Sequence, residues 1–148
     1  MAVIGFHRLE ELFRKGASLD IKKGHAKDIT DVVEKKLYDL LLMGQVTAKY
    51  NARDIIWKYD LPITKGLEQT IDEFKKLEQD IELKDILDTL ATYPATYELE
   101  IELERSLVEI VGGLLLVLAK TMKALNEDSR AVSHELIEKA SKVMDLTL

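Results

Sequence analysis

The sequence contains no cysteine, and only two prolines and seven glycines occur among its 148 residues. The lack of cysteine excludes disulfides and any cysteine-ligated metal site. The chain also lacks a long hydrophobic run, because the longest, residues 110–119, is far shorter than the about 20 residues that cross a membrane. Residues 1–6 have no basic start and too short an apolar stretch for a signal peptide. We therefore expect a cytoplasmic protein that makes no contact with membranes.

Apolar residues make up 47% of the chain and charged residues 32%, which is typical of a globular protein with a hydrophobic core. At this length we expect a single compact domain, residues 1–148. Glutamate and lysine are abundant, a composition found in heat-tolerant proteins, so we also expect a thermostable protein.

The formal net charge of −6 is unevenly distributed. Residues 1–80 carry 14 basic and 14 acidic side chains, whereas residues 81–148 carry 7 and 13. The acidic second half is therefore expected to be repelled by nucleic acid at long range.

The first half has the pattern of a short helix, a long helix and a third helix. Apolar residues recur at helical spacing over residues 6–15, where Gly16 is expected to end the helix, and over residues 26–52. A helix over residues 26–52 would be about 40 Å long, so in a chain of this size it must cross another element. Residues 54–59 are rich in β-branched and aromatic side chains, which predicts an extended segment, and Asp60 is expected to cap the third helix.

The same pattern recurs about 75 residues later, with almost no residue identity. A short helix is expected over residues 83–90. Residues 97–104 alternate between apolar and acidic side chains, and we expect them to begin extended and to end as the acidic first turn of a second long helix. Ser133 is expected to cap the final helix.

Neither unit, 1–79 or 80–148, can bury its apolar faces alone. We therefore predict an all-α fold in which the two units pair within one chain. The two long helices are expected to cross near the small residues Gly44 and Ala119.

Arg53 and Asp60 are the most specific feature of the first half. The extended segment and turn between them bring residue 60 back beside residue 53, where a bidentate arginine–carboxylate bond would lock the loop. With this pair in place, residues 6–76 resemble archaeal histones, and the whole chain resembles a bacterial family of tandem histone-fold proteins. The resemblance implies two histone folds, each a short, a long and a short helix, joined as an intramolecular handshake pseudodimer. It also implies that Arg53 and Asp60 form a structural clamp.

The residues with which histones hold DNA are largely replaced in this chain. The resemblance calls for a Lys–Thr pair after the clamp arginine, but the sequence has Asp54 and Ile55 there. It calls for basic residues at the positions of Glu10 and Leu19, and it places the second clamp arginine at Asp128. The resemblance thus carries the fold to this chain without the DNA-contact residues.

Five basic residues of the first half form a candidate phosphate-binding cluster: Arg14, Lys15, Lys22, Lys23 and Lys27. Acidic residues are interleaved among them. The alternative, which we favour, is therefore an ordinary solvated face.

No constellation of residues predicts an enzyme. His134 and Glu138 share a helix face, as in a zinc-protease motif, but they offer two ligands without a third, so we predict no metal site and no cofactor. Met43 is expected to lie in the core, and the only tryptophan, Trp57, is expected to pack against its neighbours, fully or half buried.

Two functions are compatible with this sequence. The first is a non-enzymatic structural or protein-interaction module that acts through a protein partner or through self-association. The alternative is an architectural DNA-binding protein, located at the nucleoid, that uses the basic face of the first half.

Overall fold

The structure is a computed structural model, which describes residues 6–81 and 96–148. Within these ranges the chain forms five α-helices and two short 3₁₀ turns, joined by loops that make only isolated bridges, so the predicted all-α class is confirmed. The helix predicted over residues 83–90 lies outside the described residues. The elements in chain order are α1 (Phe6–Ala17), η1 (Lys23–His25), α2 (Ala26–Tyr50), η2 (Lys58–Asp60), α3 (Lys65–Ile81), α5 (Ile101–Leu125) and α6 (His134–Thr147).

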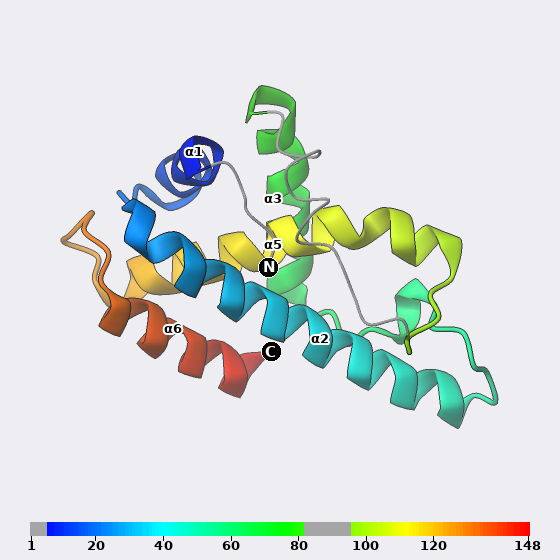
Figure 1. The fold of residues 1–148 in the computed structure, drawn as a ribbon. Helices are drawn as coiled ribbons and strands as arrows, with labels where there is room; N and C mark the ends of the chain where they lie inside the picture. The colour runs from blue at the N-terminus through cyan, green and yellow to red at the C-terminus, as the bar shows by residue number, and fades with distance from the viewer. Residues whose placement is uncertain (1–5, 82–95) are drawn as a thin grey trace.

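The two long helices, α2 and α5, are the centre of the fold (Figure 1). Each has 25 residues, and α5 begins 75 residues after α2, the offset at which the sequence pattern repeats. They run in opposite directions in Figure 1, and α1, α3 and α6 all pack against α5. Most of α5 is buried, which agrees with its long apolar run.

The loops before and after the long helices are joined in two reciprocal pairs. Asp20, in the loop before α2, forms a parallel bridge with Ala131, in the loop after α5. Ile56, in the loop after α2, forms a parallel bridge with Leu99, in the segment before α5. Backbone hydrogen bonds of 2.8 Å, from the Asp20 N–H to Arg130, and of 2.9 Å, from the Ile56 N–H to Glu98, hold these pairs. Each end of the molecule is therefore built from both halves of the chain.

A glycine pair in α5 lets α3 lie against it at close range. A methyl group on Gly112 would lie 2.3 Å from the Phe74 ring, and one on Gly113 would lie 2.5 Å from Ile71. Phe74 is fully buried at this contact. The glycine pair therefore marks the place where α3 crosses α5 at close range.

Gly16 does not end the first helix, contrary to prediction. α1 continues to Ala17, and the left-handed residue is Ser18, with φ of 54° and its N–H donating to the Arg14 carbonyl at 3.0 Å. Position 16 favours a residue without a side chain for another reason, because a methyl group there would lie 2.5 Å from Leu116 of α5.

Two further expectations about the first half are wrong. Asp60 does not cap α3, because its carboxylate is bonded to Arg53, and Thr64 accepts the Leu67 N–H at 3.2 Å instead. The small size of Gly44 does not serve a crossing with α5, since the space beside it is filled by Ile56 and Leu61.

In the second half, residues 97–104 behave as predicted. Leu99 is extended in its bridge with Ile56, and α5 begins at Ile101 with Glu102 and Glu104 in its first turn. Ser133 caps α6 by accepting the Leu136 N–H at 3.1 Å, also as predicted.

Candidate functional site

Arg53 and Asp60 form the bidentate bond that their spacing predicts. The Arg53 guanidinium donates two hydrogen bonds to the Asp60 carboxylate, at 2.6 and 2.7 Å, and the Trp57 N–H donates a third at 2.7 Å. The Asp60 side chain is only 5% exposed. The hydrogen bond from Arg53 lowers the pKa of Asp60, against the opposing effect of burial. The pair fixes the loop between α2 and α3.

Trp57 is half exposed rather than buried in the core. The Arg53 guanidinium carbon lies 3.8 Å from the centre of its ring, which is a cation–π contact. The clamp therefore holds an aromatic ring at the surface, at the end of the molecule where α2 stops.

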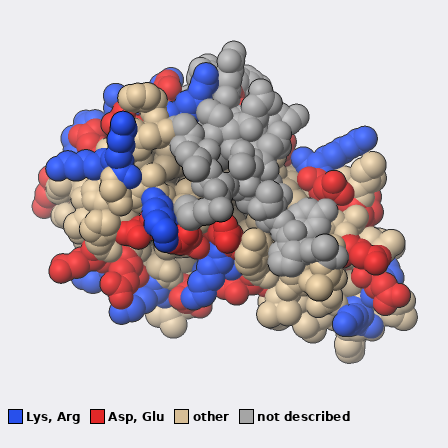
Figure 2. Space-filling view, viewed as in Figure 1, with Lys and Arg blue, Asp and Glu red and all other residues tan. Residues whose placement is uncertain are grey.

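Large hydrophobic side chains are exposed around this clamp. Of the ten exposed large hydrophobic residues in the described parts of the chain, eight lie on the second half of α2, on the loop that follows it or at the start of α5. We call these eight residues the apolar end: Leu42, Met43, Val46, Tyr50, Ile55, Trp57, Tyr59 and Ile101. Tyr50 and Tyr59 are 90% and 89% exposed. The end of α2 lies at the lower right of Figure 1, and Figure 2, in the same view, shows uncharged tan surface there.

Sequence reasoning missed the apolar end. It placed Met43 in the core, but Met43 is half exposed because the buried stripe of α2 passes through Leu37, Leu41 and Gly44 on another face. The signal was present, since residues 42, 46 and 50 are spaced by four and form a second apolar stripe.

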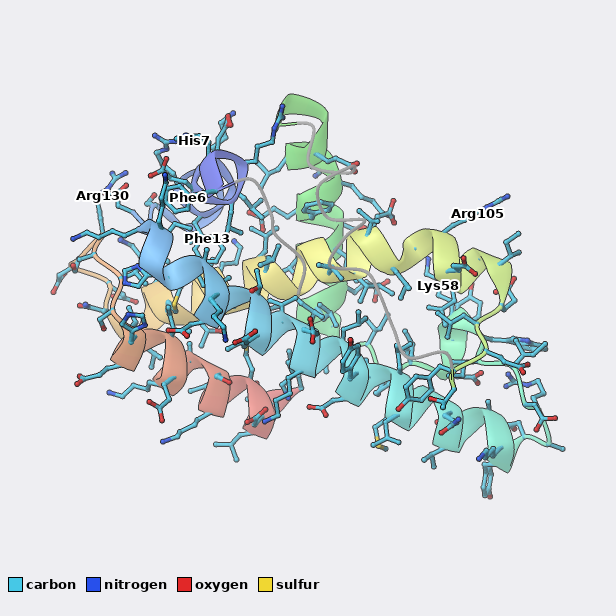
Figure 3. All side chains as sticks on the ribbon, viewed as in Figure 1. Phe6, His7, Phe13, Lys58, Arg105 and Arg130 are labelled. Atoms are coloured by element: carbon cyan, nitrogen blue, oxygen red, sulfur yellow. The ribbon has the colours of Figure 1, made fainter. Side chains whose placement is uncertain are left out.

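The charges around the apolar end are mainly acidic. Figure 3 labels Lys58 and Arg105 at this end of the molecule. Together with Lys49, they are outnumbered by five acidic residues of the adjoining segments: Asp54, Glu98, Glu100, Glu102 and Glu104. This surface therefore carries an excess of negative charge.

The opposite end of the molecule carries the candidate phosphate-binding residues. Arg14, Lys22 and Lys23 are exposed and make no ion pair within the part of the chain that the structure describes, whereas Lys15 pairs with Glu11 at 3.6 Å. Lys27 pairs with Asp31 at 2.9 Å, and this bond raises the pKa of the lysine. The cluster is thus divided between paired and unpaired side chains.

Arg130 joins this cluster through the bridge between the two halves. Its backbone carbonyl accepts the Asp20 N–H, and its guanidinium lies 3.2 Å from the Asp20 carboxylate. Figure 3 labels Arg130 at the left of the molecule, where Figure 2 shows basic side chains projecting. We call Arg14, Lys22, Lys23 and Arg130 the basic corner.

Two histidines meet beside the basic corner, where α2 and α6 begin. The rings of His25 and His134 are 5.1 Å apart and nearly perpendicular, and His134 pairs with Asp28. His25 is buried, and its Nδ1 accepts the Lys22 N–H at 3.1 Å. Burial, followed by the charges of His134 and Lys22, lowers the pKa of His25. This cluster joins the N-terminal ends of α2 and α6.

His134 and Glu138 do not gain a third metal ligand. Among residues 6–81 and 96–148, no group of three or more histidine, aspartate or glutamate side chains is placed to hold a metal ion. None of the described helices is long and apolar enough to cross a membrane.

An open groove of about 730 Å³ lies between α3, α5 and the end of α6. Its lining is mostly apolar, with side chains such as Leu67, Val117 and Val143. The two charged side chains in its lining, Glu73 and Lys120, pair with each other at 3.0 Å. Their charges are therefore satisfied within the protein.

Comparisons with known proteins agree with this architecture. The crystal structure of ttk003001566 from Thermus thermophilus matches with a TM-score of 0.86 and 38% identity over 98% of this chain and 99% of that one. The crystal structure of protein AQ328 from Aquifex aeolicus matches with a TM-score of 0.84 and 29% identity over 98% and 96%.

Sequence relatives point to the same group. An uncharacterized protein of Aquifex aeolicus (strain VF5) is 33% identical over 86% of this chain and 83% of its own length, and a second from the same organism is 31% identical over 95% and 82%. The model of a domain of unknown function, DUF1931, matches residues 9–145. The chain therefore belongs to the DUF1931 family.

Proposed function

We propose that this chain is a pair of histone folds joined as an intramolecular pseudodimer, and that it acts without catalysis as a protein-interaction module. The equal long helices at an offset of 75 residues support the pairing. The reciprocal bridges, Asp20 with Ala131 and Ile56 with Leu99, support it further, because each joins the loop before one long helix to the loop after the other. The Arg53–Asp60 bond is the clamp that the resemblance to histones implies.

The apolar end is the observation that carries the interaction role. Full burial of a large hydrophobic side chain is worth roughly 1.5–3 kcal/mol, and each of these side chains, about half exposed or more, forgoes a part of it. Single exposed hydrophobic residues are common on protein surfaces, but a concentration of them at one end marks an interaction site. Tyr50, Trp57 and Tyr59 add aromatic residues, which are enriched where proteins bind one another.

The surroundings of the apolar end favour a protein over a nucleic acid. Asp54 and Ile55 stand directly after the clamp arginine, and Glu98 and Glu100 flank the bridged Leu99. These carboxylates repel phosphate, whereas a protein partner with its own apolar patch can cover the hydrophobic side chains.

Site-specific photocrosslinking in the cells that produce this protein tests the interaction role. A photoreactive amino acid replaces Val46 at the apolar end or, as a control, Glu127 in the exposed turn between α5 and α6 at the other end of the molecule. We expect a protein adduct from position 46 and none from position 127. A chain that forms no protein adduct at position 46, in any growth condition, would remove the interaction role.

DNA binding through the basic corner is the second candidate. It is favoured by the bridge that brings Arg130 from the second half to the same loop pair as Lys22 and Lys23. Fluorescence anisotropy with generic duplex DNA at low and at physiological salt measures it. Binding through about three phosphate contacts would give a slope of log K against log salt near −3, and Lys22→Ala with Lys23→Ala would reduce it by about two.

A further inference from the structure

We infer that the partner of the apolar end is a second copy of this chain, bound with its α2 antiparallel to the first. This inference rests on the proposed interaction role and names the occupant of that surface. It follows from the order of charged and apolar side chains along the second half of α2.

Four residues of α2 define the contact: Asp39, Leu42, Val46 and Lys49. Their spacing of three, four and three residues keeps them along one side of the helix. The stripe begins with an acid, continues with two hydrophobic side chains and ends with a base. Such a stripe is self-complementary when two copies run in opposite directions.

A two-fold axis between Leu42 and Val46 sets the register. It places Leu42 of one copy against Val46 of the other, and Asp39 of one copy against Lys49 of the other. The symmetry generates each contact twice, as in any isologous dimer. The stripe from residue 39 to residue 49 is about 15 Å long, enough for three turns of helix to lie against each other.

Both charged ends of the stripe are available for this contact. Lys49 is exposed and makes no ion pair with any residue that the structure describes. The Asp39 side chain is 51% exposed, and among the described residues its one ion pair is a long one, 3.8 Å, to Lys36. Lys36 is bonded more closely, at 2.9 Å, to Asp145 of α6, so Asp39 can turn to a partner at little cost.

The same register accounts for an exposed leucine at the far end of α6. Leu146 is 87% exposed and follows Asp145, which contacts Lys35 and Lys36 of α2. Antiparallel packing brings Tyr50 of the second copy to this level of α2. Tyr50 and Leu146, two of the most exposed hydrophobic side chains, would then cover each other.

Charge-reversal variants of the full chain test this dimer by sedimentation equilibrium. The unaltered protein is expected at twice its 16.8 kDa mass. Asp39→Lys or Lys49→Asp alone sets like charges against each other at both symmetric positions, so we expect a dimer dissociation constant raised about tenfold or more. The double variant Asp39→Lys/Lys49→Asp restores opposite charges and is expected to return the dissociation constant to near its original value.

Two further variants separate the contact from general effects. Val46→Glu buries a carboxylate at the centre of the dimer and is expected to give a monomer with an unchanged circular dichroism spectrum, because Val46 is exposed in the single chain. Lys139→Asp changes an exposed residue of α6 away from the contact and is expected to leave the dimer intact.

The outcomes distinguish this inference from the interaction role. A monomeric unaltered protein at every concentration, or a double variant that stays as weak as the single ones, overturns the dimer. If photocrosslinking at position 46 then captures a different protein, the interaction role stands with another partner. If it captures none, both proposals fall.

Discussion

At the scale of single residues, Asp60 is a charged side chain held almost out of contact with water. It is nearly buried and accepts two hydrogen bonds from Arg53 and one from the Trp57 N–H. A buried carboxylate is stable only when its charge is matched in this way. The loop after α2, and with it the exposed Trp57 ring, therefore depends on one side chain.

Asp60→Asn is expected to destabilise the fold by about 1–3 kcal/mol, because the amide replaces a charge-assisted acceptor with a neutral one and turns an N–H towards the guanidinium. Urea denaturation at neutral pH measures the loss. Asp54→Asn, at an exposed position in the same loop, is the control and should leave stability almost unchanged. Equal midpoints for the two variants would show that the clamp contributes nothing to stability.

His25 gives the protein a predicted dependence on pH. Its pKa in the folded protein is below the ordinary value of about 6.5, so the unfolded chain binds more protons in that region. Stability is therefore highest above about pH 6.5 and falls as the pH drops from there towards the lowered pKa. Protonation also removes the acceptor that Nδ1 offers to the Lys22 N–H.

Melting temperatures measured at intervals from about pH 7.5 to about pH 5.5 follow this loss. His25→Asn keeps an acceptor near the Nδ1 position but does not titrate in this range. We expect its melting temperature to fall less steeply than that of the unaltered protein. Parallel curves for the two proteins would place the pH dependence elsewhere.

At the scale of elements, the glycine pair of α5 sets how closely α3 can approach. Gly112→Ala would place a methyl group against the Phe74 ring, which is fully buried. We expect a loss of about 1–3 kcal/mol from this overpacking, measured by thermal or urea denaturation.

Gly66→Ala provides a matched control on α3. A methyl group at position 66 meets nothing within 4 Å, and the residue is exposed near the start of the helix. Alanine there favours the helix, so we expect a gain of up to about 1 kcal/mol. A stable Gly112→Ala variant would mean that α3 shifts outward, and that the close crossing is not required.

The helices were predictable from this sequence, whereas the residues at which they end and the roles of their glycines were less predictable. Apolar periodicity located α1, α2 and α5 because burial of one face is what selects a helix. The same pattern cannot show which tertiary contact requires a glycine at a given position. Gly16 and Gly44 make room for Leu116 and for Ile56 with Leu61, contacts that depend on tertiary structure.

Of the candidate site, the sequence could indicate only what is local. The Arg53–Asp60 pair was predictable because the two residues are only seven positions apart, at the two ends of one short loop. The Asp20–Arg130 contact spans 110 residues, and no local pattern announces it. The apolar end was missed because α2 carries apolar residues on two faces, and burial alone decides which face is core.

At the scale of the whole molecule, the unpaired basic side chains of the basic corner and the exposed hydrophobic side chains of the apolar end lie at opposite ends. The basic corner and the apolar end are both formed at loop pairs that join the two halves, so each surface depends on the complete chain. Substitutions that loosen the pairing of the halves are thus expected to alter both surfaces together.

The reciprocal loop pairs also govern the order in which this protein can mature. During synthesis the loops around Asp20 and Ile56 leave the ribosome first, but their partners, Ala131 and Leu99, are translated much later. Until then the nascent first half carries an unfilled apolar surface where α5 will lie. Folding must await long-range closure, so the interval of synthesis between the two halves is when this chain is most exposed to aggregation and to chaperones.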